Sequence, residues 1–530
     1  MLLKKVPEVL VSLFALSAFS SANTSANAQS KSSPNILVIM TDQQRWDALR
    51  HSGANTIIKT PNLDKLAAGG AYFSQACSPC PVSGPARTSI LTGRLNENNG
   101  IRTNMDSDDN KASDYKTFDQ LLVANGYVAE YFGKFHSPDY MATCYSNQSE
   151  YGYTGSKLIK NWEKLYHFYL GENSKKYQPK TDELIDFSFF DGATYKPVLM
   201  DRRYSKLPSG QLSEKELVGR QLSQPDHHGT LNLNSELSIT ALQGRQTIAA
   251  IERNKSKKFA ITCSFHYPHS PMLPTEPYAS MYKASEMPVP KTITDQMVGN
   301  PYLKSNGRLY MPEYADSAKI GYMIANYYAL VTEIDDWVGK IINKLDELKL
   351  RDNTLIVFMS DHGEMLGAHG MREKNVFLEE SVRVPLILSY KGKIEARKIE
   401  TPVSLVNIFP TILDYAGIKA ESDGYSLRNL ANGKEAKVDF AVSEWNWEKQ
   451  DVPNLMIRTK EWKLLISRYN TKKYADALFD LKTDPYELNN LLYTDKASNL
   501  KTAEALKAKL VGYLESVKYP YLEEVKKRQF

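Results

Sequence analysis

The chain contains 530 residues, of which 42% are hydrophobic and 24% charged, and its formal net charge is +5. This length suits one large domain and a smaller one, while the small net charge and the lack of a dense basic run argue against a nucleic-acid-binding protein. Four cysteines are too few for a fold built on disulfides, so we interpret Cys77 and Cys80 as packing residues or, at most, one structural bridge.

The first 28 residues have the three parts of a secretory signal peptide. Lys4 and Lys5 form a positive start, residues 9–22 form an apolar core, and Ala26-Asn27-Ala28 is a small-residue cleavage site. The apolar run is too short and too rich in serine for a membrane span. We therefore expect an exported protein, periplasmic or secreted, that is soluble and has no transmembrane segment after cleavage.

A first strand is predicted at residues 36–40, where five apolar residues follow one another as in a central strand covered on both faces. The strand runs on to Asp42 and Gln43, and open α/β sheets place their sites at the carboxyl ends of strands. Taken alone, Asp42 fits a cap for the next helix as well as it fits a metal ligand.

A helix is predicted to begin near Ser83, because Pro85 suits the first helical turn. Ser83 then lies beside the unpaired N–H groups of the helix start, where an anion is favoured. Arg87 lies one turn further along the same face. For the Ser-x-Pro triplet taken alone, a capped helix whose arginine makes a surface ion pair is the better explanation.

Three later strands, predicted at 127–132, 259–265 and 354–359, also run into polar residues. Those residues are Lys134 and His136 after the first strand, His269 after the second, and Asp361 and His362 after the third. Strand alternation places Lys134 and His136 on one side, where together they can hold an anion. Prolines on both sides of His269 keep its backbone rigid.

The alternation of strands and helices predicts an α/β fold with a large, mostly parallel sheet sandwiched by helices. A long amphipathic helix is predicted at 315–348, and its apolar stripe indicates core packing. After residue 420, short strands and a Lys-rich helix at 500–518 predict a smaller C-terminal antiparallel sheet plus helix. We therefore expect an N-terminal domain at 29–420 and a C-terminal subdomain at 421–530.

Residues 140–235 show little sustained periodicity. A segment this long without clear elements is usually functional, so we expect it to contribute ligand selectivity. Within it, Asp226, His227 and His228 form a short polar cluster that could bind a metal. A polar turn is the more ordinary interpretation of this cluster.

One motif consists of Ser83-Gly84-Pro85-Ala86-Arg87, followed at a fixed distance by Leu91-Thr92-Gly93-Arg94. It resembles the signature of the type I sulfatases. The polar residues at the strand ends match that family's pattern in chain order. The resemblance implies a member of the alkaline-phosphatase superfamily whose catalytic domain at 29–420 hydrolyses sulfuric esters. It also implies that a serine-acting, anaerobic maturation enzyme oxidises Ser83 to formylglycine (3-oxoalanine).

The resemblance further implies a metal site. Its ligands would be Asp42, Gln43, Asp361, His362 and the modified Ser83. Four oxygen donors and one imidazole suit a hard divalent cation, and the resemblance favours one Ca²⁺ ion. Many family members have a second aspartate where Gln43 stands. The neutral amide lowers the negative charge of the site by one, which leaves Mg²⁺ or Mn²⁺ as alternatives.

The catalytic roles implied by the resemblance are as follows. Arg87 would hold the hydrated aldehyde. The charge on the sulfuryl oxygens would be stabilised by Lys134, Lys374 and His269. His136 would act as the base that restores the aldehyde. Either His269 or Lys374 would protonate the leaving alkoxide, and we favour His269 because the ordinary pKa of histidine lies near neutrality. Glu364 and His369 would surround the site without touching the substrate.

Export and the elaborate middle segment favour a sulfated carbohydrate as the substrate, with exposed aromatic side chains stacking on sugar rings. The candidate substrate-binding residues are Arg102, Asn104, His228, Trp445 and Trp447. An arginine bonded locally within its loop is an equal alternative for Arg102.

Two other functions compete with a sulfatase. The spelling Asp42-Gln43-Gln44-Arg45 also resembles the phosphodiester and phosphonate monoester hydrolases of the same superfamily. The second alternative is a secreted glycan-binding protein that has lost catalysis, which is disfavoured because every expected polar position is filled. The sequence does not specify the sugar or the sulfate position.

Overall fold

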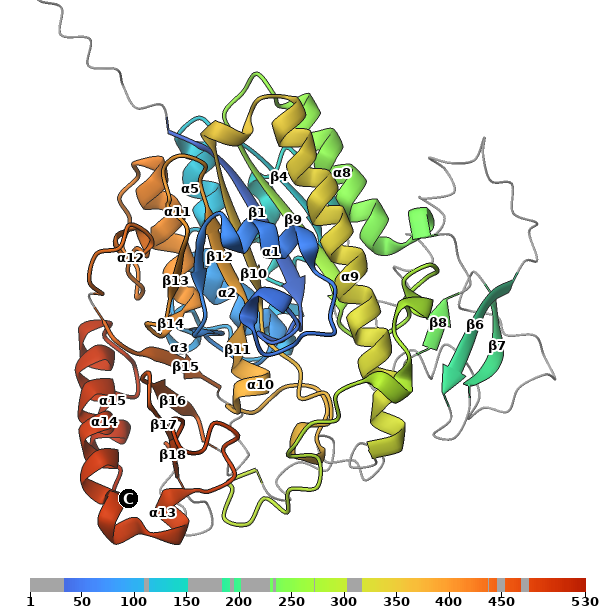
Figure 1. Cartoon of the computed structure of the whole chain (residues 1–530). Helices are drawn as coiled ribbons and strands as arrows, with labels where there is room; N and C mark the ends of the chain where they lie inside the picture. The colour runs from blue at the N-terminus through green and yellow to red at the C-terminus, as the bar shows by residue number, and fades with distance from the viewer. Residues whose placement is uncertain are drawn as a thin grey trace, which may run out of the picture. The chain divides into compact units, whose positions relative to one another are not determined.

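Strand β1 (Asn35–Asp42) lies inside an eight-stranded sheet, and all of its residues are buried (Figure 1). It pairs in parallel with β10 (Thr354–Ser360) on one side and with β9 (Phe259–Pro268) on the other. The sheet continues beyond β9 with β4 (Val128–Gly133) and β5 (Asn147–Glu150), and beyond β10 with β12 (Leu386–Ser389), β2 (Ala71–Phe73) and β13 (Arg397–Ile399). Strand β12 runs antiparallel to both of its neighbours, whereas the other neighbouring strands of this sheet pair in parallel. The prediction of a mostly parallel sheet is therefore confirmed.

The computed structural model describes residues 33–108, 114–150, 184–190, 195–201, 229–231, 235–270, 272–302, 317–436, 438–445, 453–468 and 476–530. The predicted signal peptide at 1–28 lies outside these residues, as do Asp226, His227, His228 and Trp447. Within them, no helix is both long enough and apolar enough to cross a bilayer.

Helices cover both faces of the large sheet because the side chains of β1 alternate in direction. Leu37 and Ile39 pack with α1 (Pro61–Ala68), α8 (Ile239–Arg253) and α9 (Ser317–Glu347). Ile36, Val38 and Met40 face the opposite layer, which contains α2 (Ser83–Thr92), α5 (Phe118–Ala124) and α11 (Ile408–Ala416). Helices α8 and α9 lie side by side (Figure 1), and the apolar stripe of α9 is core, as predicted.

The C-terminal part contains an antiparallel sheet of four strands in the order β15-β16-β17-β18. These strands are β15 (Ala441–Glu444), β16 (Leu455–Arg458), β17 (Trp462–Ile466) and β18 (Ala477–Asp480). Helix α14 (Lys496–Ser516) buries Ala503, Leu506, Leu510 and Leu514 against this sheet. The predicted antiparallel sheet with a terminal helix is therefore confirmed, while the domain boundary at 420 stays a prediction.

The remaining elements are short. A three-stranded sheet joins β11 (Arg383–Val384), β3 (Ala76–Cys77) and β14 (Val403–Ser404), and another joins β7 (Tyr195–Asp201), β6 (Leu184–Phe190) and β8 (Gly229–Leu231). The short helices are α3 (Asn96–Asn99), α4 (Asn104–Asp108), α10 (Glu379–Val382), α12 (Arg428–Ala431), α13 (Leu491–Thr494) and α15 (Leu522–Lys527). The described parts of segment 140–235 thus include three antiparallel strands, which the sequence did not reveal.

Candidate active site and metal centre

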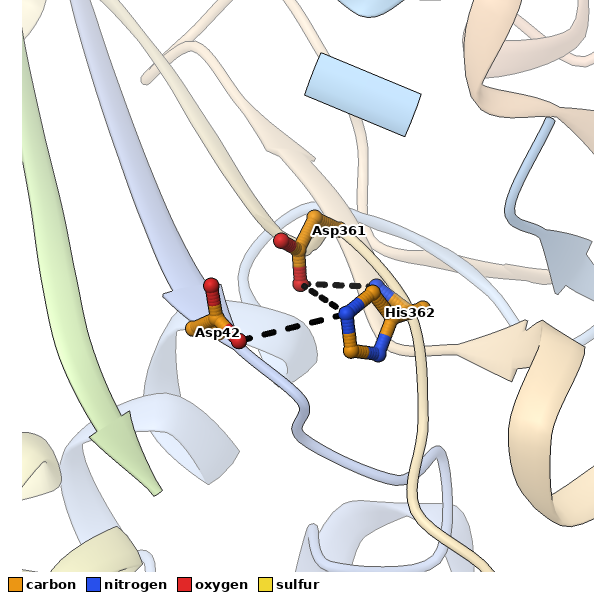
Figure 2. Close-up of side chains that lie close together, drawn as sticks. All are labelled: Asp42, Asp361 and His362. Carbon is orange, nitrogen blue, oxygen red and sulfur yellow. Dashed lines mark hydrogen bonds and ion pairs between the residues drawn. The ribbon is translucent and has the colours of Figure 1, made fainter. Parts of the chain in front are cut away.

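The carboxyl ends of β1 and β10 bring two aspartates together. The parallel register pairs Thr41 with Ser360, so Asp42 and Asp361 follow at the same edge of the sheet. His362 comes next in the chain, and one ligand atom from each of these three buried residues lies within 4.8 Å of the other two. Figure 2 shows the His362 ring close to both carboxylates. Its Nε2 lies 3.9 Å from Asp42 Oδ1 and 3.8 Å from Asp361 Oδ1.

These three side chains fit a divalent cation. His362 Nδ1 lies 2.9 Å from the carbonyl oxygen of Gly363, and because a carbonyl only accepts, Nδ1 carries the proton and the Nε2 lone pair faces the carboxylates. Asp42 Oδ1 is buried and has no hydrogen-bond partner among the residues that the structure describes. A buried carboxylate oxygen without a partner is unfavourable unless something positive is bound to it.

Ser83 is the first residue of helix α2 and points at this cluster. Its Oγ lies 2.8 Å from His362 Nε2 and 3.5 Å from Asp42 Oδ2, and it accepts a hydrogen bond of 3.3 Å from Lys134 Nζ. The side chain is 1% exposed. The helix begins at Ser83, as the sequence predicted, and its last residue, Thr92, is followed by Gly93 as a C-cap with a left-handed φ of 66°.

Arg87 ties the two aspartates to each other. Its Nε donates to Asp361 Oδ2 at 2.8 Å and its second terminal nitrogen donates to Asp42 Oδ2 at 2.9 Å. Burial alone would raise the pKa of Asp42, but the cation of Lys134, followed by His269 and Arg87, holds that pKa well below its ordinary value of 3.8. Asp42 is therefore an anion, as a carboxylate that binds a metal must be.

Lys134 and His136 come directly after β4, and their side chains lie near Asp42. Gly133 makes this approach feasible, because its φ is +103° and a Cβ there would lie 1.9 Å from the carbonyl oxygen of Ser264. Lys134 Nζ lies 2.5 Å from Asp42 Oδ2. Burial first, and then the charges of Lys134 and Arg87, hold the pKa of His136 well below 6.5, so its ring is neutral.

Gln43, His269 and Lys374 form the other side of the site. Lys374 Nζ donates to Gln43 Oε1 at 2.6 Å and lies 3.0 Å from His269 Nε2. His269 Nδ1 donates to the carbonyl oxygen of Ser270 at 2.6 Å, so Nε2 accepts from Lys374. Burial and the charges of Lys374 and Lys134 keep the pKa of His269 well below its ordinary value. Gln43 also donates through Nε2 to Glu364.

Two predicted substrate residues are used in local bonds. Arg102, whose side chain is 33% exposed, donates from Nε to Glu97 at 2.6 Å, in line with the local-bond alternative. Asn104 Oδ1 accepts from the backbone N–H of Gly84 at 2.9 Å, so Asn104 supports the start of the Ser83 helix.

The expectation that Trp445 is an exposed aromatic is wrong. Trp445 is 3% exposed and packs in an apolar cluster that includes Tyr302, Phe377 and Met456. The cluster forms where the C-terminal sheet meets the segment after Lys374, a contact that no local pattern predicts. Cys77 and Cys80 are both buried free thiols, which agrees with a packing role and not with a bridge.

Sequence reasoning missed Ser264. Its Oγ accepts from Arg87 at 2.8 Å and donates to the carbonyl oxygen of Lys134 at 2.7 Å, so it joins two residues of the site. Ser264 lies inside the buried strand β9 and has no motif around it. A polar residue within an apolar strand was the only available signal.

Comparison with known proteins gives consistent matches over nearly the whole described chain. The family model described as "Sulfatase" matches residues 34–418, and "N-sulphoglucosamine sulphohydrolase, C-terminal" matches residues 367–516. An N-acetylglucosamine-6-O-sulfatase of Bacteroides thetaiotaomicron is 28% identical over 514 residues, which cover 91% of this chain and 86% of that protein.

Two further matches come from related hydrolases. The multifunctional alkaline phosphatase superfamily protein PehA of Trinickia caryophylli is 27% identical over 492 residues, 86% of this chain and 91% of that protein. The phosphonate monoester hydrolase structure from Silicibacter pomeroyi superposes with a TM-score of 0.71 at 20% identity, covering 91% of this chain and 95% of that one. At this identity the superposition shows a common fold.

Proposed function

Because this chain belongs to the sulfatase family and is a sulfuric ester hydrolase, we propose that it removes O-sulfate groups from sulfated carbohydrates. The similarity to an enzyme named for a sulfated amino sugar supports this substrate class. The proposal includes export, which the pattern of residues 1–28 supports, and a catalytic domain at 29–420.

One observation carries the mechanism. The hydroxyl of Ser83 lies 2.8 Å from His362 Nε2. Asp42 Oδ1, 3.9 Å from the same nitrogen, is buried without a hydrogen-bond partner in the described part of the chain. A hydroxyl at such a position can take part in binding a cation and can face a sulfate group held there. An unmodified serine would be a poor nucleophile, and its sulfate ester would have no easy route back to the free enzyme.

We therefore propose that Ser83 is oxidised to formylglycine. The maturation enzyme would remove two protons and two electrons from the Ser83 side chain, turning its CH2OH group into an aldehyde, and would pass the electrons to an acceptor of its own. The aldehyde adds water to give two hydroxyl groups on one carbon. One hydroxyl can attack sulfur, and the other lets the sulfate leave by reforming the aldehyde.

The proposed ligands fit a hard divalent cation. Asp42, Gln43, Asp361, His362 and the residue-83 side chain would hold it, and Ca²⁺ suits their four oxygen donors, with Mg²⁺ or Mn²⁺ as alternatives. Such an ion supplies positive charge that polarises the sulfuryl oxygens and lowers the pKa of a nearby hydroxyl.

The other residues would handle charge and protons. Lys134 and Lys374 supply fixed cations for the charge that spreads over the sulfuryl oxygens. The sequence favoured His269 as the proton donor to the leaving sugar oxygen, but in this structure His269 Nε2 accepts from Lys374 Nζ. We therefore propose that the Lys374–His269 pair supplies that proton, with Lys374 as its donor. His136, neutral because of its burial, would accept the proton when the aldehyde reforms. Arg87 would hold the two aspartates and the residue-83 side chain in register.

The test is mass spectrometry of the peptide containing Ser83, prepared from the native host, together with sulfate release from a panel of sulfated oligosaccharides. We expect a peptide lacking two hydrogens and measurable sulfate release, both abolished in Ser83→Ala. An active enzyme with an unmodified Ser83 would refute the formylglycine step. A correctly modified protein that binds sulfated glycans but releases no sulfate would refute the hydrolase activity on this substrate class.

Hydrolysis of phosphodiesters or phosphonate monoesters is the second candidate. It is supported by the similarity to the multifunctional protein PehA and by the motif Asp42-Gln43-Gln44-Arg45, which resembles that of these hydrolases. Both reactions need a cation and an in-line attack, so the site alone does not separate them. The two activities are separated by measuring kcat/KM for a sulfate ester and for a phosphodiester with the same leaving group and comparing the two values.

A further inference from the structure

The carboxylate of Glu364 collects three hydrogen bonds at the edge of the site. It is 1% exposed. Its Oε2 accepts from Gln43 Nε2, and its Oε1 accepts from the backbone N–H groups of Leu366, at 3.1 Å, and of Glu373. These bonds tie the side chain of Gln43 to the loop that carries Lys374.

The bond to Gln43 decides which way its amide points. A carboxylate only accepts hydrogen bonds, so Glu364 must face the NH2 group of Gln43. The amide oxygen is thereby turned to the opposite side, where it accepts from Lys374 Nζ at 2.6 Å. That oxygen has a second lone pair, which a cation can use. An aspartate in place of Gln43 would present oxygens on both sides and would need no such orientation.

The hydrogen bond from the backbone N–H of Glu373 acts on Lys374, the hydrogen-bond partner of Gln43. Because it holds the backbone directly before Lys374, the same carboxylate sets both ends of the Gln43–Lys374 hydrogen bond. Lys374 in turn lies 3.0 Å from His269 Nε2. A change at Glu364 would therefore alter the placement of groups that Glu364 itself does not touch.

We propose that Glu364 is a positioning residue that holds the Gln43 amide with its oxygen toward Lys374 and the cation site. The part of this inference that concerns the cation rests on the proposed function. The part that concerns the Gln43–Lys374 contact does not.

The first variant is Glu364→Gln, which keeps the shape of the side chain. The new amide oxygen would retain the two backbone N–H groups, so its NH2 would face Gln43 and turn that amide over. We expect Ca²⁺ binding, measured by calorimetry, to weaken about 10- to 100-fold, as is typical when a group supporting a metal ligand is changed. Sulfate release should fall with it.

The second variant exchanges the two groups, as Gln43→Glu with Glu364→Gln. A carboxylate at 43 accepts both from the amide at 364 and from Lys374, so Ca²⁺ affinity and turnover should recover toward wild type. The control is Glu373→Gln, which removes a negative charge next to Lys374 while leaving the three bonds to Glu364 intact. It should change the affinity little. Thermal unfolding of each variant checks the fold.

Crystal structures of the metal-free wild type, single variant and exchange variant give a readout that needs neither metal nor activity. In Glu364→Gln, Lys374 Nζ should move beyond hydrogen-bond distance of residue 43, more than about 3.5 Å, and the exchange should bring it back. Lys374 staying on Gln43 in the single variant would overturn the inference, as would an exchange variant as impaired as the single one. A wild type without Ca²⁺ binding or sulfate release would instead refute the proposed function.

Discussion

Arg87 Nε lies 2.8 Å from Asp361 Oδ2, and both side chains are at most 1% exposed. The same guanidinium reaches Asp42, so one planar group from helix α2 sets the spacing of two carboxylates that come from β1 and β10. A planar fork with fixed donors can do this, whereas a single ammonium cannot. The spacing of the aspartates therefore depends on the helix that carries Ser83.

Replacing Arg87 with alanine should lower the free energy of unfolding by about 3–5 kcal/mol, because it leaves buried carboxylates without their partner. Arg87→Lys keeps the charge but loses the fork, so we expect it to recover part of the stability and little of the activity. Urea unfolding and kcat/KM of both variants provide the measurements. An Arg87→Lys enzyme as active as wild type would contradict the positioning role.

His269→Ala and Lys374→Ala should slow the release of sulfate from sugars far more than from activated phenols, because only a poor leaving group needs a proton. The loss on sugar sulfates should be about 100-fold or more. The double variant should lose little beyond either single one, since the two residues share one hydrogen bond. Equal losses on both classes of leaving group would remove the pair from the proton-donor role.

Removal of divalent metal with a chelator should abolish turnover and lower the melting temperature without unfolding the protein. The fold should persist because Arg87 and Lys134 already pair with Asp42. Ca²⁺ at 100 times its Kd should restore about 2.7 kcal/mol of stability. Asp42→Asn serves as the control, since its melting temperature should respond little to added Ca²⁺. Full activity in excess chelator would contradict a metal-dependent site.

Trp445→Ala should act on stability and not on substrate affinity. Because the indole is buried in the cluster with Tyr302 and Phe377, its loss should cost about 3–5 kcal/mol of unfolding free energy. The KM of the protein that remains folded should stay near wild type for oligosaccharide sulfates. A large rise in KM with unchanged stability would show that Trp445 binds substrate after all.

The His369–Asp295 pair should make stability depend on pH. His369 Nδ1 lies 2.6 Å from Asp295 Oδ2. Burial would lower the pKa of His369, but the hydrogen bond to Asp295, aided by the charges of Glu380 and Glu487, raises it above 6.5. Burial would raise the pKa of Asp295, yet the bond to His369 lowers it below 3.8.

The sign of each shift sets the pH window. The stabilisation from His369 is fully present below pH 6.5 and is lost as pH rises through its raised pKa. The stabilisation from Asp295 is present above pH 3.8 and is lost as pH falls through its lowered pKa. Asp295→Asn should therefore reduce the urea midpoint more at pH 5.5 than at pH 9. A difference that does not change with pH would contradict an ionised pair.

Local patterns in the sequence were sufficient for the strands and for the polar residues at their ends. Apolar runs such as 36–40 predicted β1. The position of Asp42 at the edge of the sheet could also be predicted, because it comes shortly after such a run, at the carboxyl end of the strand. The start of α2 at Ser83 and the length of α9 are likewise local properties. These features involve only near neighbours in the chain, so the sequence by itself determined them.

Contacts between distant segments were decided only by the tertiary structure. The sequence placed Trp445 on the surface, but the C-terminal sheet packs it against residues more than 60 positions away. It named Gln43 and Glu364 without showing that Glu364 accepts a hydrogen bond from Gln43, 321 residues away in the chain. Burial and hydrogen-bond direction depend on which surfaces meet, and that is settled by the packing of the whole sheet, not by any single stretch.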